Sequence, residues 1–312
     1  MQRKTLKRTS ALLTAPIAAA ALLFLTGCGG AASVDTAAEQ DFYGTTVSFH
    51  QDLADRVPEE WKSGITVPAK VLQPNAFVDE DGAVVGMQPD LVEAFSALWG
   101  IPITVESVAF DGHVPGVMAE KYAFTVSTGD HEKRREVMDM VDYSAAGVAW
   151  LTQADSDLTS KDDICGHVIG VIKGTDQEER AHEKAEACAA QGIEGTEAIG
   201  FSNTLISVPL QAERIDVAYD SLAQMVYFAE NQSDEFRLVG DPEPGVTLAL
   251  GVKAGEQEKV DLLQDSLQEL MDSGAYEAIF AEWGLSDLML DRAYVNGQDF
   301  SPEVQELVHI PQ

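Results

Sequence analysis

The sequence predicts an α/β fold from its apolar pattern, its composition and its length. From residue 65 onward, short apolar runs alternate with amphipathic stretches, which is typical of strands layered against helices. With 45% hydrophobic and 23% charged residues, the composition is that of an ordinary globular protein. A chain of 312 residues also has room for two domain-sized units, because single cores usually stop growing at about 250 to 300 residues.

The first half of the folded region shows a helical period most clearly near residue 90. Apolar residues at 91, 94, 95 and 98 follow the i, i+3, i+4, i+7 pattern, so we expect a helix that Asp90 caps and Gly100 ends. Residues 29–45 are small and polar and predict a linker. We also expect a short helix over 52–61, strands over 101–107 and 124–127, and a second helix over 111–120.

The second half continues the alternation. Residues 168–172 predict a buried strand, and a charged helix over 176–189 follows it. Residues 215–219 predict another strand, which runs into Asp220. Two amphipathic helices come last, with apolar residues over 260–271 and 276–283 and stops at Gly274 and Gly284.

The chain is strongly acidic, with 20 Lys+Arg against 52 Asp+Glu and a formal net charge of −32. This balance argues against a broad phosphate-neutralising surface, so we expect no nucleic-acid partner. The acidic residues are spread along the chain without a single-sign block, a pattern typical of a solvated surface rather than of a calcium site.

The motifs of metal, nucleotide and hydrolase sites are missing from the sequence. The six histidines are scattered without paired spacing, which predicts no metal site. No GxSxG, Walker or GxGxxG string occurs, so we expect no cofactor and no catalytic residues. A binding protein is therefore favoured over an enzyme.

The N-terminal residues predict export. Four basic residues within positions 2–8 precede an apolar run over 11–25, which is too short to span a bilayer comfortably. The run ends in Leu25-Thr26-Gly27-Cys28, which resembles the lipobox of bacterial lipoproteins. That resemblance implies a signal peptide over 1–27 and a Cys28 that carries lipid, followed by a tether and short helix over 28–64. The alternative is a cysteine that happens to end an ordinary signal sequence.

Export also affects the interpretation of Cys165 and Cys188. Neither cysteine lies in a CxxC motif, and no second ligand cluster accompanies them. In an oxidising compartment such a pair is expected to form a disulfide rather than a reactive thiol pair.

Several short motifs follow one another in a fixed order through the exported region. They lie at residues 75–82, 110–112, 120–122, 138–143, 267–284 and 295–297. Their order and spacing resemble those of the extracellular solute-binding proteins of ABC importers, family 3, which capture polar amino acids. The resemblance implies the type II periplasmic-binding-protein fold, in which two α/β lobes are joined by two crossings and the ligand lies between them.

The resemblance also implies the limits of the lobes. Lobe 1 is expected to comprise residues 65–148 and 249–312, and lobe 2 residues 149–248. The crossings are expected near 147–149 and 247–249, where hinge closure would bring the lobes together.

An amino-acid zwitterion needs donors for its carboxylate and acceptors for its ammonium. Arg134 lies five residues before Asp139, where the family places its carboxylate-binding arginine. Arg135 is the alternative, and both could instead be ordinary surface cations. The resemblance assigns a second carboxylate contact to Gly174 and Thr175, because the backbone N–H groups at the start of the following helix attract anions.

For the ammonium, the resemblance indicates Asp220. Its place at the end of a predicted strand agrees, since ligands bind at the carboxyl ends of strands in open α/β sheets. Ser127, Thr128 and Gly129 match the family's ligand-binding loop, although small hydroxyl residues also form ordinary turns. His131 lies beside this loop, and a nearby histidine predicts pH-dependent binding.

Together these observations predict a lipid-anchored, extracytoplasmic substrate-binding protein of an ABC importer. Its expected partners are an amino acid, the ABC permease subunits, and the membrane through the lipid on Cys28. Two alternatives stay open: an enzyme of the same fold such as a cyclohexadienyl dehydratase, and a sensory lipoprotein without a transport role.

Overall fold

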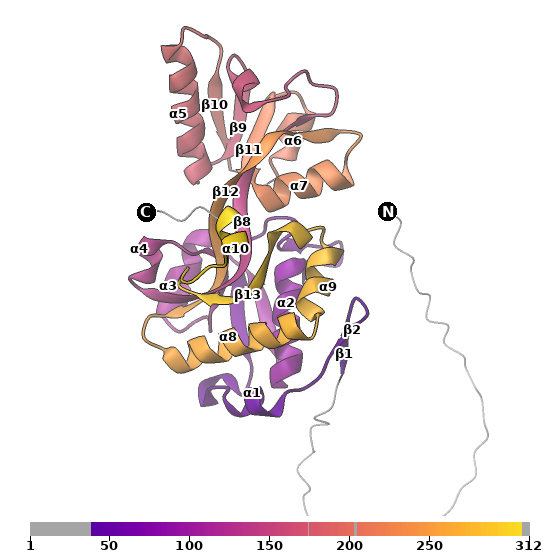
Figure 1. The fold of residues 1–312 in the computed structure, drawn as a ribbon, viewed down its shortest axis with the longest axis vertical. Helices are drawn as coiled ribbons and strands as arrows, with labels where there is room; N and C mark the ends of the chain where they lie inside the picture. The colour runs from indigo at the N-terminus through magenta and orange to yellow at the C-terminus, as the bar shows by residue number, and fades with distance from the viewer. Residues whose placement is uncertain (1–38, 174, 203–204, 308–312) are drawn as a thin grey trace, which may run out of the picture. The chain divides into compact units, whose positions relative to one another are not determined.

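The structure is a computed structural model that describes residues 39–173, 175–202 and 205–307 (Figure 1). The signal peptide, Cys28 and Gly174 lie outside the described residues. Within the described part of the chain, no helix is both long and apolar enough to cross a membrane.

The first described residues form a hairpin in place of the expected linker over 29–45. Strands β1 (Gln40–Phe42) and β2 (Thr45–Val47) pair antiparallel. Tyr43 and Gly44 both have positive φ, as a two-residue type I′ turn requires. The linker prediction was wrong for residues 40–45. It rested on the polar residues of this segment and left out Phe42, which is buried in the core.

A short helical region follows the hairpin, as expected, but in two pieces. Helix α1 (Gln51–Asp55) and the 3₁₀ turn η1 (Glu59–Trp61) are separated by Pro58, which caps the second piece. Trp61 is buried and stacks against Trp99 at 6.2 Å between ring centroids.

We keep the names lobe 1 and lobe 2 for the residue ranges predicted above. A parallel pair of strands opens the range of lobe 1. Strand β3 (Ile65–Ala69) pairs with β6 (Ile103–Ser107), and helix α2 (Met87–Trp99) connects them after the small hairpin of β4 (Phe77–Val78) and β5 (Val84–Val85). Helix α2 begins at Met87, so Asp90 lies in its first turn and is not its cap. Gly100 ends the helix in the left-handed conformation, as expected.

The largest sheet has seven strands in the order β10-β9-β11-β8-β12-β7, with β13 pairing with β8. Its two longest strands, β8 (Met138–Gln153) and β12 (Phe236–Lys253), run antiparallel over most of their length (Figure 1). Irregularities interrupt this ladder between Val239 and Glu243 and between Pro244 and Thr247. The expected crossings, at 147–149 and 247–249, both lie on this ladder. They are not directly opposite each other, because Gly147 pairs with Pro244.

The other strands of this sheet include β7 (Thr125–Gly129), β9 (Val168–Ile172), β10 (Glu197–Phe201) and β11 (Val217–Ser221). In lobe 2, β9 and β10 are joined by α5 (Asp176–Ala190), and α6 (Ser207–Gln211) and α7 (Leu222–Asn231) follow. One core cluster includes Ile169, Val171 and Val217, and another includes Leu151 and Ala218, so alternate residues of each strand supply different clusters.

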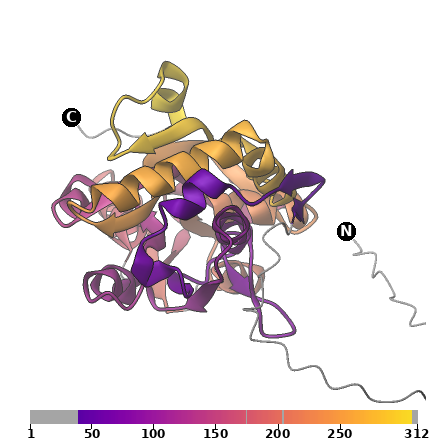
Figure 2. The same cartoon turned by 90° about the horizontal axis from the view of Figure 1, so that it is seen from below.

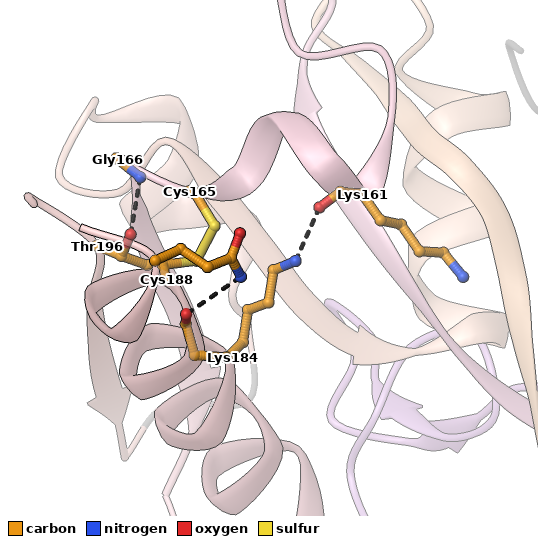
Figure 3. Close-up of a disulfide and its surroundings, with 8 residues drawn as sticks. Lys161, Cys165, Gly166, Lys184, Cys188 and Thr196 are labelled. Atoms are coloured by element: carbon orange, nitrogen blue, oxygen red, sulfur yellow. Dashed lines mark hydrogen bonds between the residues drawn. A yellow bond between two sulfur atoms is a disulfide. The ribbon is translucent and has the colours of Figure 1, made fainter. Parts of the chain in front are cut away.

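The expected disulfide between Cys165 and Cys188 is confirmed, and it joins the end of η3 (Lys161–Ile164) to α5 (Figure 3). Near it, Lys184 of α5 donates to the Lys161 carbonyl at 3.1 Å. The bond therefore fixes the charged helix α5, whose buried face is small, to the loop before β9.

The C-terminal region packs on lobe 1. Helices α8 (Gln257–Asp272) and α9 (Ala275–Glu282) match the two expected helices, and α8 lies beside α1 (Figure 2). The 3₁₀ turn η4 (Ser286–Leu288), strand β13 (Met289–Val295) and helix α10 (Pro302–Leu307) come after them. Val304 of α10 belongs to a small apolar cluster with Ala145 of β8, so α10 covers the central strand.

Candidate functional site

A cavity of about 240 Å³ lies where several strand ends meet. We call it the cleft. Its walls include residues 144–148 of β8 and 244–246 of β12, and both lobes contribute the remaining residues. Of the predicted site residues, the cleft is lined by Ser127, Gly129, Thr175 and Asp220.

Asp220 brings a carboxylate into the cleft from β11. The residue is 3% exposed, and one of its oxygens, Oδ1, accepts from the Ser221 N–H at 2.7 Å. Among the described residues, no hydrogen-bond donor reaches the other oxygen, Oδ2. Burial raises the pKa of Asp220, while the Ser221 N–H and the Lys70 ammonium act in the opposite direction. A cation supplied by a ligand would stabilise this carboxylate further.

Two more buried acceptors line the same cleft. The Asn75 Oδ1 and the Ser221 hydroxyl are buried, and neither has a hydrogen-bond partner within the described part of the chain. Burying a polar atom without a partner costs free energy, so an occupant that donates hydrogen bonds is favoured here. An ammonium group, with three donors, has the right chemistry for these acceptors.

Thr175 lies at the start of α5, as the sequence predicts. Its side chain accepts from the Glu178 N–H at 3.3 Å and donates to the Ile172 carbonyl at 2.7 Å, so it caps the helix. Thr175 and Gln177 both line the cleft, which brings the first turn of α5 to it. Backbone N–H groups in a first helical turn have no partner inside the helix and attract anions.

Ser127, Thr128 and Gly129 form the end of strand β7 rather than the predicted loop, and their side chains differ in role. The Ser127 hydroxyl donates to Gln88 Oε1 at 2.6 Å and lies at the cleft, and Gly129 lies there also. Thr128 is fully buried, and its hydroxyl contacts Thr125 at 2.6 Å and the Ala249 carbonyl at 3.3 Å. Side chains alternate along a strand, so the Thr128 hydroxyl is on the face away from the cleft.

Arg134 and Arg135 in α4 (Glu132–Arg135) have different surroundings. Arg135 forms two hydrogen bonds with the buried Asp130 carboxylate, at 2.6 and 3.0 Å. Arg134 instead donates to the carbonyl of Gly129, a residue that lines the cleft. Arg134 does not itself line the cleft in this structure, but its guanidinium lies 5.8 Å from the centroid of the Phe110 ring, which does.

Asp130 also lies next to a second buried acid, Asp142 of β8. Asp142 accepts from the Thr247 hydroxyl and from the Gly297 N–H, the latter at 3.0 Å. Burial, and next the negative charge of Asp130, raise the pKa of Asp142 to about 8. This pair links β8 to β12 and to the loop after β13, so it stabilises the strands that border the cleft.

The lining residues that sequence reasoning did not assign to the site include Lys70, Gln88 and Phe110. Gln88 orients Ser127 and donates to the Tyr143 hydroxyl at 2.7 Å. Lys70 directly follows β3, so the argument that identified Asp220, a charged residue at the carboxyl end of a strand, could have found it too. His131, the residue before α4, also lines the cleft, and its effect on pH dependence stays a prediction. Among the described residues, no group of His, Cys, Asp and Glu side chains could hold a metal ion.

Comparison with known proteins adds two kinds of finding. The sequence model of the bacterial extracellular solute-binding proteins, family 3, matches residues 66–286. The arginine-binding protein ArgT of Corynebacterium glutamicum is 26% identical over 229 residues, which are 72% of this chain and 75% of that protein. The arginine-binding extracellular protein ArtP of Bacillus subtilis is 23% identical over 210 residues, 65% of this chain and 79% of that protein.

Solved structures show the same fold. An ancestral arginine-binding protein bound to arginine matches with a TM-score of 0.58 and 24% identity, covering 70% of this chain and 97% of that chain. An ancestral cationic amino acid solute binding protein, AncCDT-1, matches with a TM-score of 0.62 and 19% identity, covering 75% and 98%. The expected fold class, that of type II periplasmic binding proteins, is therefore confirmed.

Proposed function

The chain belongs to the bacterial extracellular solute-binding proteins of family 3, and from this premise we propose that it binds an amino acid in the cleft and delivers it to the permease of an ABC importer. The observation that carries the proposal is the Asp220 carboxylate, which is 3% exposed and has an oxygen that no donor of the described residues reaches. A free ammonium group on the ligand supplies the missing donor.

In this proposal the ammonium contacts lobe 2, and the carboxylate contacts both lobes. In lobe 2, Asp220 and Ser221 bind the ammonium, and the first turn of α5 at Thr175 offers N–H groups to the carboxylate. In lobe 1, Arg134 binds the carboxylate once the lobes close, and Ser127 contributes its hydroxyl. The lobes, residues 65–148 with 249–312 and residues 149–248, close about the two crossings, because a ligand stabilises the state in which it contacts both lobes.

The proposal includes anchoring of the mature chain to the membrane through lipid on Cys28. The small residues at 26 and 27 and the preceding apolar run support this anchor. A Cys28→Ala chain is then expected in the soluble rather than the membrane fraction of the producing cell.

The test is a thermal-shift screen of the purified full chain in detergent against the twenty amino acids, followed by calorimetry on each hit. A ligand that binds only the folded state stabilises it by about 2.7 kcal/mol at a hundredfold excess over Kd, and the melting temperature rises as a result. We expect a selective shift with at least one amino acid. The absence of any shift, with the protein folded and stripped of bound ligand, contradicts the proposal.

The variant Arg134→Gln tests the proposed carboxylate contact. Loss of a charged partner in a closed cleft costs about 2 kcal/mol or more in binding free energy. The matched variant Lys133→Gln removes a neighbouring, exposed cation of the same helix and is expected to bind normally.

A further inference from the structure

Two cations converge on one aromatic ring at the edge of the cleft. The Lys70 ammonium lies 5.7 Å from the centroid of the Phe110 ring, and the Arg134 guanidinium lies 5.8 Å from the same centroid. Phe110 lines the cleft and is 41% exposed. We call these three residues the cationic corner. Like charges repel, so a corner with two cations favours an anion between them.

Two titratable residues, His113 and Asp111, lie near the cationic corner. His113 of α3 (His113–Met118) is fully buried, and burial lowers its pKa, as do the charges of Lys70 and Arg134. His113 is therefore neutral near pH 7, with its Nε2 3.2 Å from the Val108 carbonyl. Asp111 is exposed, and it acts on His113 less strongly than Lys70 does.

Few other charged side chains are found among the described residues that line the cleft. Asp220 is the one carboxylate among its described lining residues. Arg180, a further cation in the lining, has the Tyr219 hydroxyl as a hydrogen-bond partner. No carboxylate of a described residue forms an ion pair with the Lys70 ammonium, although Lys70 is close enough to Asp220 to lower its pKa.

These charges decide which side chain the cleft accepts. An amino acid always brings one ammonium and one carboxylate, and these need one anion and one cation from the protein. Asp220 supplies the anion and Arg134 the cation, which leaves the Lys70 ammonium for the ligand side chain. A guanidinium or ammonium side chain would add a third positive charge at the cationic corner, whereas a carboxylate side chain would be paired there.

We propose that the ligand is an acidic amino acid, L-glutamate or L-aspartate, and that Lys70 binds its side-chain carboxylate. This inference rests on the proposed function, because it assumes an amino acid held at Asp220. Phe110 forms the wall that places the side chain between Lys70 and Arg134, and the Lys70 N–H donates to the Ser127 hydroxyl at 3.3 Å, which fixes the lysine backbone.

The test is calorimetric titration of the purified full chain with L-glutamate, L-aspartate, L-glutamine, L-arginine and L-lysine at 0.15 M salt. We expect one of the two acids to bind at least about 30-fold more tightly than glutamine, because the amide has nearly the same volume but no charge for Lys70 to pair with. Arginine and lysine are expected to bind more weakly than glutamine.

Lys70→Gln then assigns the effect to one residue. We expect it to weaken binding of the preferred acid by about 30-fold while changing glutamine binding by less than about threefold. The matched control is Lys121→Gln, which also removes a lysine over an aromatic ring, that of Tyr122 at 4.4 Å, but outside the cleft. The control is expected to bind like the unaltered protein.

The outcomes separate this inference from the proposed function. Tighter binding of arginine, lysine or glutamine than of both acids overturns the inference and leaves an amino-acid receptor. Equal losses of acid and glutamine binding in Lys70→Gln overturn the role of Lys70. If no amino acid binds to folded, ligand-stripped protein, the proposed function fails and the inference fails with it.

Discussion

Among the described lining residues, the one carboxylate of the cleft comes from lobe 2, which also contributes Arg180, whereas lobe 1 contributes Lys70 and no carboxylate. Lys70 lines the cleft from lobe 1, and both its ammonium and the Arg134 guanidinium lie close to the centroid of the Phe110 ring, at 5.7 and 5.8 Å. From lobe 2, Asp220 lines the cleft together with the Ser221 hydroxyl. A ligand that satisfies both lobes must itself carry separated charges, which agrees with an amino acid. The difference also means that neither lobe alone provides a complete site.

The two lobes also differ in how they are stabilised. Lobe 1 contributes most of one large apolar cluster that includes Phe95, Trp99 and Phe280. Lobe 2 holds two smaller clusters and the disulfide between Cys165 and Cys188. A small core buries less apolar surface, so a covalent link contributes a larger share of the stability. Lobe 1 is therefore expected to depend on packing and buried ion pairs, and lobe 2 on its disulfide.

The largest effect is expected from Arg135→Gln in lobe 1. This change strands the Asp130 carboxylate, whose side chain has no exposed surface, and breaking a buried ion pair typically costs about 3 to 5 kcal/mol. Urea unfolding should show the loss. Arg134→Gln, one residue earlier, should change the unfolding free energy by less than about 1 kcal/mol and instead weaken binding. Equal stability losses in the two variants would contradict the different roles of these arginines.

In lobe 2, replacing both Cys165 and Cys188 by serine is expected to lower the free energy of unfolding by about 3 kcal/mol, because the disulfide closes a loop across a sequence separation of 23 residues. Chemical unfolding with and without a reductant measures the effect, and the reductant should shift only the protein that retains both cysteines. A reductant-insensitive transition in that protein would show that lobe 2 does not need the bond.

A pH-dependent effect on stability is expected from the buried acids of lobe 1. Because the pKa of Asp142 is raised to about 8, the folded protein binds a proton that the unfolded chain releases near pH 4. The associated stability is fully present below about pH 4 and is lost as the pH rises toward 8, by at most about 1.4 kcal/mol per pH unit. In Asp142→Asn the slope of unfolding free energy between pH 5 and 8 should flatten. An unchanged slope would remove Asp142 as its source.

Much of the fold follows from local sequence patterns. The strand over 168–172, the helix at 176–190 and the Gly100 stop were predictable because each depends on neighbouring residues. The 16 residues of β8 and the 18 residues of β12 were not, because their length comes from pairing between segments far apart in the chain. Strand β13 is defined in the same way, by its pairing with β8.

The features of the candidate site also differ in whether local sequence predicts them. That Asp220 and Thr175 line the cleft was predictable because both follow recognisable strands, and a strand end fixes where the next side chains lie. The pairing of Arg135 with Asp130 was not, because in a chain with 52 acidic residues the sequence does not show which of them is buried. The burial of the Thr128 hydroxyl depends on the strand register of β7, which a short run of small residues leaves undefined.

The measurement that tests the central claim most directly is calorimetric titration of Asp220→Asn beside the unaltered protein, with the best amino-acid ligand from the screen. We predict a loss of at least about 2 kcal/mol in binding free energy, because the ligand ammonium loses its anionic partner in lobe 2. The ligand-free variant should unfold at no lower urea concentration, since the buried Asp220 carboxylate is itself costly. The control Asp234→Asn, an exposed acid of lobe 2, should bind normally. Unaltered affinity in Asp220→Asn would contradict the division of charge between the lobes.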